Sequence, residues 1–167
     1  MSVYAVVLAA GASSRYGTEP PKQVELLPQV LAALGESSVD EVVVVSGAHA
    51  LPVESVQCPD WERGPGASLR CGLAALPREA EAAVVVLADG PDLDPRAIDR
   101  VVDDWHANGA DAVAATYAGV RLHPVLLARA LWDAVPDEGA KSIPARLVPC
   151  DDLRPPGDVD SATPAGS

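Results

Sequence analysis

The chain has 167 residues, enough for one domain with a sizeable apolar core, and 49% of them are hydrophobic. Its formal net charge of -12 argues against nucleic acid or an anionic membrane as a partner, because both require a basic surface. Three cysteines without a C-x-x-C pair favour reduced thiols over a disulfide scaffold or a zinc site, so we expect a cytoplasmic protein.

Apolar runs rich in valine and alanine recur along the chain. Such runs are typical of strands that are buried on both faces, as in a parallel sheet covered by helices on both sides. The first run is too short to cross a membrane. We expect strands at Val3–Ala9, Glu41–Val45 and Ala82–Ala88, and a weaker one at Ala110–Thr116.

Helical patterns lie between and after these runs. Ser68 and Asp94 are candidate N-caps, and Pro28 suits a first helical turn, where its missing N–H is not needed. The helices are expected from Pro28 through Leu34 and over Ser68–Leu76, Pro95–His106, Leu126–Val135 and Gly139–Leu147.

This alternation of strands and helices predicts a doubly wound α/β fold, a single three-layer domain with a mostly parallel sheet. We expect one domain over residues 1–160 and a C-terminal tail over residues 161–167.

The segment after the first strand carries small residues and two cations. In open parallel sheets ligands bind beyond the carboxyl ends of the strands. Small residues from Gly11 to Ser14 let the backbone offer amide groups to an anion, and Arg15 and Lys22 add positive charge. The segment matches neither G-x-x-x-x-G-K-[ST] nor G-x-G-x-x-G. A nucleoside triphosphate fits it better than a neutral ligand, and an ordinary turn with solvated cations is the alternative.

Three other residues carry candidate chemistry. Asp89 directly follows a buried run, where an acid needs a cation or hydrogen bonds; Mg²⁺ with a triphosphate is one partner, and an Asp-Gly-Pro turn is the alternative. Asp160 lies in a Gly- and Pro-rich stretch that by composition is a loose tail. His123 lacks the spacing of a catalytic triad or a metal site, which favours a structural role.

The opening segment "LAAGASSRYG" with Lys22 resembles the signature L-A-A-G-x-S-x-R-M-G-x-x-K of nucleotidyltransferases similar to the molybdenum cofactor guanylyl- and cytidylyltransferases. Their superfamily includes sugar-nucleotide pyrophosphorylases. Tyr16 replaces the usual Met, and "TEPPK" sets Lys22 farther from Gly17 than in the signature. In the later family motif G-D-x-G-A-R-x-L, which Pro136 and the segment "DEGAKSI" match, Pro136 replaces the first Gly and Lys141 replaces the Arg. The other matching segments follow in the same order over nearly the whole chain: "GPGASLRCGL", "VVLADGPDL", "HPVLL", "DEGAKSI" and "DVDSATP".

The resemblance implies transfer of an NMP group from an NTP to a small phosphorylated acceptor, with molybdopterin suggested, release of pyrophosphate and Mg²⁺ as cofactor. It assigns catalytic roles to Arg15, Lys22 and Asp89, and metal binding to Asp89 and Asp160, with Asp158 as the alternative second ligand. His123 and Lys141 would contact the acceptor. The nucleotide would be bound by Leu8, Ala9, Ala10, Gly11, Ala12, Ser13, Arg15, Lys22, Ser68 and Gly72.

Within that family, L-A-A-G together with S-L-x-x-G-L and H-P-V resembles the cytidylyltransferases, so we expect CTP to be favoured over GTP. The resemblance adds a molybdoenzyme or a maturation protein as a docking partner. The alternative is a catalytically degenerate nucleotide-binding or partner-docking module of the same fold. Pyrophosphate release with a panel of nucleotides distinguishes the two.

Overall fold

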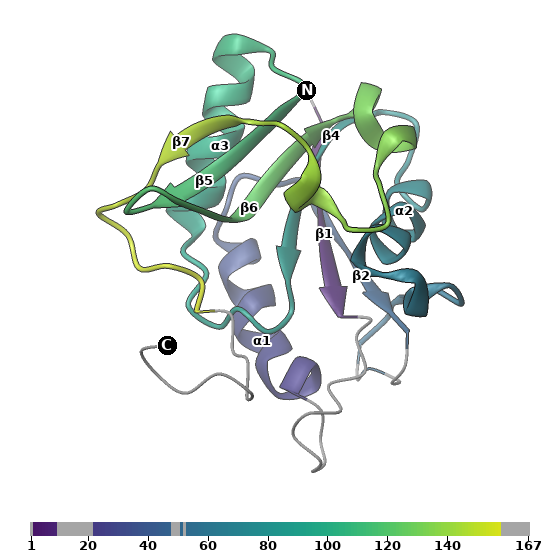
Figure 1. The fold of residues 1–167 in the computed structure, drawn as a ribbon. Coiled ribbons are helices and arrows are strands. Elements are labelled where there is room, and N and C mark those ends of the chain that lie inside the picture. The colour runs from purple at the N-terminus through teal and green to yellow at the C-terminus, as the bar shows by residue number, and fades with distance from the viewer. Residues whose placement is uncertain (1, 10–21, 48–50, 52, 158–167) are drawn as a thin grey trace.

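The computed structural model describes residues 2–9, 22–47, 51 and 53–157. At its centre is a 7-stranded sheet in the order β3-β2-β1-β4-β6-β5-β7 (Figure 1). Its strands are β1 (Ser2–Ala9), β2 (Glu41–Ser46), β3 (Val56–Gln57), β4 (Ala80–Leu87), β5 (Ala112–Tyr117), β6 (Val120–Ala128) and β7 (Arg146–Pro149). Its helices are α1 (Lys22–Gly35), α2 (Pro65–Ala74) and α3 (Pro95–Asn108), with 3-10 helices η1 (Trp61–Arg63), η2 (Arg129–Ala134) and η3 (Ala140–Ser142).

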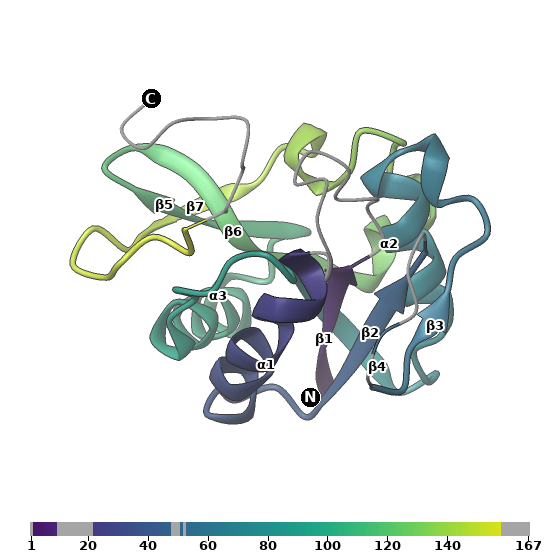
Figure 2. The ribbon, with the colours of Figure 1, turned by 90° about the horizontal axis from the view of Figure 1, so that it is seen from below.

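Helices cover both faces of the sheet. Helices α1 and α3 pack on one face, and α2 and η2 pack on the other (Figures 1 and 2). Neighbouring residues of β1 therefore enter different cores: Val7 packs with α1 and α3, and Val6 packs with α2, and both are fully buried. This burial on both faces is why the strand reads as a continuous apolar run. The predicted single three-layer α/β domain is confirmed.

The sheet is mostly parallel. Strand β1 pairs in parallel with β2 and β4, and β2 with β3 and β5 with β7 are parallel as well. Strand β6 is antiparallel to both β4 and β5. The start of β6, rather than its end, therefore lies beside the carboxyl end of β4.

Several predicted helix boundaries are wrong. The segment from Leu126 continues β6 because Leu126 and Leu127 pair with both neighbouring strands, and only η2 after it is helical. Similarly, the segment expected as the last helix holds the short η3 and the start of β7. Helix α1 begins at Lys22 and holds Pro28 in its interior, where burial of residues such as Leu27 offsets the lost hydrogen bond.

The two predicted N-caps have different outcomes. Asp94 caps α3 as expected, because its Oδ1 accepts a hydrogen bond of 2.9 Å from the main-chain nitrogen of Arg96. Helix α2, however, begins at Pro65 with Gly64 as its N-cap, so Ser68 lies inside the helix and is buried. A proline in the first turn accounts for the earlier start.

The expectation of reduced thiols is wrong for two of the three cysteines. Cys58 and Cys71 form a disulfide, with their Cα atoms 5.8 Å apart, while Cys150 is free and buried. The chain turns back through η1 onto α2, which brings the pair together without a C-x-x-C spacing. Of the helices in the described ranges, none combines the length and apolar composition needed to cross a bilayer.

Gly72 provides a test of the packing between α2 and the sheet. A Cβ atom built there would lie 2.6 Å from Cγ1 of Val6 and 2.7 Å from Cγ2 of Val45, both fully buried. Overpacking should exceed the gain in helix propensity, so Gly72→Ala should lower the free energy of unfolding by about 1–3 kcal/mol in urea titrations. Gly35→Ala is the control, because nothing lies within 4 Å of a Cβ there. Equal stability of the two variants would contradict this account.

Candidate functional site

The carboxyl ends of β1 and β4 meet at one edge of the sheet. Leu8 lies opposite Leu87, and the main-chain nitrogen of Ala88 donates a 3.0 Å hydrogen bond to the Leu8 carbonyl. Ala9 and Asp89 therefore come at the same edge, as expected for segments that follow parallel neighbours. The predicted residues Ala10, Gly11, Ala12, Ser13 and Arg15 lie outside the described residues. Lys22 is the first residue of α1, but its side chain also lies outside the description.

Asp89 sits in the turn directly after β4 and is half-buried. The neighbouring acids have structural partners: Asp92 lies 3.3 Å from the guanidinium of Arg154, and Asp94 caps α3. The Asp89 carboxylate acts electrostatically on His123 of β6. The structure thus brings together two sequence-predicted site residues that are far apart in the chain.

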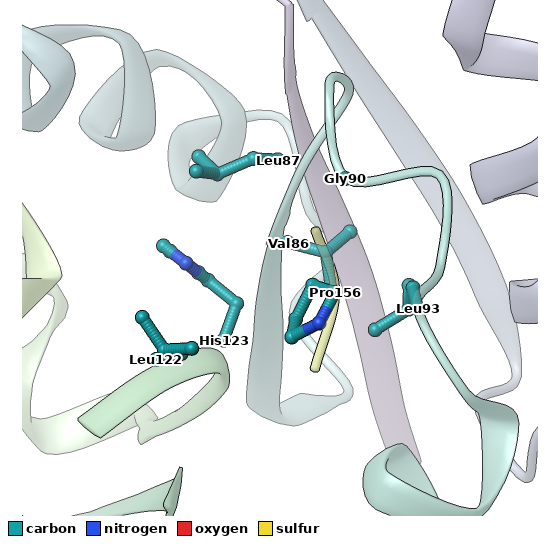
Figure 3. A pocket seen from close by; sticks show the side chains of 7 residues that line it. All are labelled: Val86, Leu87, Gly90, Leu93, Leu122, His123 and Pro156. Atoms are coloured by element: carbon teal, nitrogen blue, oxygen red, sulfur yellow. The ribbon is translucent and has the colours of Figure 1, made fainter. Parts of the chain in front are cut away.

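The segment that follows β7 crosses this turn. The main-chain nitrogen of Asp92 donates a 2.8 Å hydrogen bond to the carbonyl of Pro156, and a Cβ at Gly90 would be 3.3 Å from Cβ of Pro156. In Figure 3 Pro156 lies between His123 and Leu93, and these residues help to line a cavity of about 40 Å³. The chain is therefore held beside the Asp89 turn up to Gly157, while Asp158 and Asp160 lie outside the described residues.

His123 lies near the start of β6, and its imidazole is neutral at pH 7. Burial lowers the pKa of His123 to about 4; the Asp89 carboxylate opposes this shift, and the Arg121 guanidinium adds to it. The hydroxyl of Tyr117 donates a 3.1 Å hydrogen bond to the His123 carbonyl, which ties this part of β6 to β5.

A larger cavity of about 300 Å³ opens beside His123. Leu8, Val85, Leu87 and Val125 give it an apolar floor on the sheet. Its charged lining residues are Arg121, Glu138 and Lys141, of which Glu138 and Lys141 are exposed. The size and the mixture of an apolar floor with few polar groups suit a small ligand.

One wall of this cavity is built where the start of α2 docks on the segment before η3. The Gly66 nitrogen donates a 2.9 Å hydrogen bond to the Asp137 carbonyl, and a Cβ at Gly66 would overlap the carbonyl of Pro136. Arg70 donates bonds of 2.6 Å both to the Val135 carbonyl and to Oδ1 of Asp137. Arg70, together with Arg63, lowers the pKa of Asp137. Sequence reasoning missed this contact, and the glycines at 64 and 66 were its only signal.

Two residues predicted to bind the nucleotide lie in α2. Gly72 is buried and packs closely against Val6 and Val45 of the sheet, and its contact with a nucleotide stays a prediction. Ser68 is also buried, one turn after the start of α2. Lys141 is exposed in η3 and lines the 300 Å³ cavity together with His123.

Comparison with known families decides the relationship. Residues 5–146 match the family described as "MobA-like NTP transferase domain". The chain belongs to this family. The family resemblance drawn from the motifs is therefore confirmed.

Curated relatives of the chain are longer proteins. The bifunctional protein GlmU of Rhodococcus jostii (strain RHA1) is 32% identical over 123 residues, which are 61% of this chain and 25% of that protein. GlmU of Mycolicibacterium gilvum (strain PYR-GCK) is 30% identical over 132 residues, or 66% of this chain and 26% of that protein. The chain thus spans about a quarter of the length of these relatives.

Solved structures match the fold over almost its full length. Rv0371c from Mycobacterium tuberculosis H37Rv has a TM-score of 0.78 and 27% identity, with 96% of this chain and 94% of that chain covered. A manganese complex of Rv0371C matches with a TM-score of 0.73 and 25% identity, covering 96% of this chain and 94% of that one. The nucleotidyl transferase Mth528 from Methanothermobacter thermautotroptrophicus, at 22% identity and a TM-score of 0.68 over 83% of this chain and 78% of that one, shares the fold.

The neutral state of His123 predicts a pH dependence of stability. In the unfolded chain a histidine titrates near pH 6.5, whereas in the fold the pKa is about 4. Between these values the unfolded chain binds more protons, so the free energy of unfolding should fall as the pH drops from about 6.5 towards about 4.

Urea unfolding at pH 7 and at pH 5 should therefore show a smaller loss of stability for His123→Gln than for the unmodified protein. His106→Gln, at an exposed position of α3, is the matched control and should keep the full loss. An equal loss in all three proteins would contradict the lowered pKa of His123.

Proposed function

We propose that this chain is a nucleotidyltransferase that moves an NMP group from an NTP to a small phosphorylated acceptor and releases pyrophosphate with Mg²⁺. The observation that carries the proposal is the meeting of the β1 end, the Asp89 turn and His123 at one sheet edge, beside a 300 Å³ cavity. Membership of the MobA-like NTP transferase family over residues 5–146 supports the reaction class.

The reaction asks for alignment and charge neutralisation rather than for covalent chemistry by the protein. An oxygen of the acceptor phosphate attacks the α-phosphorus, the bond from that phosphorus to the bridging oxygen breaks, and pyrophosphate leaves. An acceptor phosphate that is already ionised needs no general base.

In the proposal Arg15 and Lys22 hold the β- and γ-phosphates, and the small residues from Ala10 to Ser13 offer backbone amides. Leu8 and Ala9 lead into this segment from β1, and Ser68 and Gly72 of α2 complete the proposed nucleotide-binding set.

The residues present fit a divalent cation that is completed by substrate. Among the described residues no group of 3 or more His, Cys, Asp and Glu side chains could hold a metal alone. Mg²⁺ commonly takes one or two carboxylates together with phosphate oxygens, and the position of Asp89 in the turn after β4, at the edge where β1 also ends, supports such a role. Asp89 and Asp160 would hold the ion, which when bound neutralises the charge on the phosphates.

The path of the chain supports a second ligand from the terminal segment. Pro156 is hydrogen-bonded to the Asp89 turn through the Asp92 nitrogen. An extended chain spans about 3.3–3.6 Å per residue, so Asp160 follows Gly157 within about 10 Å of chain. Asp158 is the alternative ligand on the same segment.

The acceptor is assigned to the 300 Å³ cavity, with His123 and Lys141 as binding residues. Molybdopterin is the acceptor we propose, and CTP the favoured nucleotide, by resemblance to the cytidylyltransferases. A cytoplasmic location and docking to a molybdoenzyme or a maturation protein belong to the same proposal.

Asp89→Asn tests the metal role. The change keeps the size of the side chain and removes its charge, so turnover should fall about a hundredfold or more, as when one electrostatic contact to a transition state is lost. Pyrophosphate release with CTP, Mg²⁺ and molybdopterin measures this, and circular dichroism checks that the fold is kept. Asp92→Asn in the same turn should change turnover only a few-fold. Unchanged Mg²⁺-dependent turnover in Asp89→Asn would remove Asp89 from the site.

Nucleotide choice is tested by thermal unfolding with CTP, GTP, ATP and UTP, each with and without Mg²⁺. A ligand at about a hundred times its dissociation constant adds about 2.7 kcal/mol, which raises the melting temperature of a domain of this size by roughly 5–10 °C. CTP with Mg²⁺ should give the largest rise. A larger rise with GTP would assign the chain to the guanylyl branch, and no rise with any triphosphate would favour the non-catalytic alternative.

A further inference from the structure

Arg121 of β6 holds the turn that forms one wall of the 300 Å³ cavity. Its Nη1 donates a 2.7 Å hydrogen bond to the Ile143 carbonyl, and its Nη2 donates a 2.9 Å hydrogen bond to the Ala140 carbonyl. These carbonyls lie on the two sides of Lys141, which lines the same cavity. Arg121 therefore fixes the backbone that carries the exposed lysine.

The charge of Arg121 is not balanced by a carboxylate within the described residues. Burial lowers its pKa, and no acid in that part of the chain opposes the shift. Its Nε is buried without a hydrogen-bond acceptor there. Six other arginines differ from Arg121 in this respect, because an aspartate pairs with each of them: Arg63, Arg70, Arg96, Arg100, Arg146 and Arg154.

An unbalanced guanidinium in a half-buried place is costly, since carbonyl groups neutralise only part of its charge. Each terminal nitrogen of a guanidinium carries two N–H groups, and each of these two hydrogen bonds of Arg121 uses one of them. The remaining N–H groups can serve a ligand in the cavity that Arg121 lines. Lys141 adds a second cation to the lining, while the only acid of the described lining, Glu138, is exposed.

We propose that Arg121 is a specificity-determining residue that binds an anionic group of the acceptor. This contact places the apolar body of the acceptor on the cavity floor made by Leu87 and Val125. The proposal deepens the proposed function, because it assigns the acceptor of that reaction to a class: small molecules with an apolar body and a phosphate or similar anion. A neutral molecule of the same shape would leave the guanidinium charge unbalanced and bind weakly.

Phenyl phosphate is a suitable probe because it combines an apolar ring with a phosphate, and phenol is its neutral counterpart. Titration followed by the amide resonance of Lys141 in ¹H–¹⁵N NMR spectra gives the affinity without requiring turnover. Phenyl phosphate should bind at millimolar concentrations and phenol should not. Arg121→Gln should weaken binding about tenfold or more, since a charge-assisted contact is lost, whereas Arg121→Lys should retain most of the affinity.

Arg129 offers a matched control at the opposite end of β6. It too donates to two backbone carbonyls, those of Pro77 and Ala80, and it lies outside the lining of the 300 Å³ cavity. Arg129→Gln should leave the affinity for phenyl phosphate unchanged. Spectra of each variant show whether the fold is kept before affinities are compared.

The outcomes separate this inference from the proposed function. Equal affinity of Arg121→Gln and the unmodified protein, or equal binding of phenol and phenyl phosphate, would overturn the role of Arg121 even if CTP binds with Mg²⁺. Displacement of phenyl phosphate by saturating CTP with no dependence on Arg121 would place the probe in the nucleotide site and overturn it too. Arg121-dependent binding of phenyl phosphate would support it even if no triphosphate binds.

Discussion

The parallel pairing of β1 with β4 is the constraint on which the site depends. Because Leu8 lies opposite Leu87, the segments that leave both strands start at the same edge of the sheet. That pairing is held by burial on both faces, where Val6 and Val7 enter separate cores and are fully buried. A shift by one residue would exchange the two faces of β1, so the packing that stabilises the domain also places the ligand edge.

Strand β6 brings residues from the start of a strand to the edge where the parallel strands end. It runs against β4, so its first residues reach the edge where β4 ends. Arg121 and His123 thereby join Asp89 although more than thirty residues of sequence, about the length of a βαβ unit, separate them. The two side chains differ in charge: burial keeps His123 neutral at pH 7, while Arg121 remains charged, because the pKa of a guanidinium starts so high.

Close contacts that glycine permits join the segments around the cavity. The Gly66 nitrogen binds the Asp137 carbonyl at a distance that leaves no space for a side chain, and Arg70 ties α2 to the same segment. The Cys58–Cys71 disulfide joins the segment after β3 to α2. A wall built from α2 and the residues before η3 is thus connected to the sheet on one side and to Lys141 on the other. The described lining of the 300 Å³ cavity carries two cations, Arg121 and Lys141, and one acid, Glu138, in a protein whose formal net charge is -12.

Local pattern by itself determined the α/β class, the main strands and the α3 cap, because strand periodicity, apolar runs and Asp94 act over a few residues. The motif order also led to the family. Tertiary structure decided the rest. Leu126 and Leu127 fit a helical stripe, but pairing with two neighbouring strands makes them part of β6. Cys58 and Cys71 meet only because η1 turns the chain back onto α2. Arg121 lies at the ligand edge because β6 runs antiparallel to β4. Such features depend on long-range contacts, whose partners no local pattern of residues specifies.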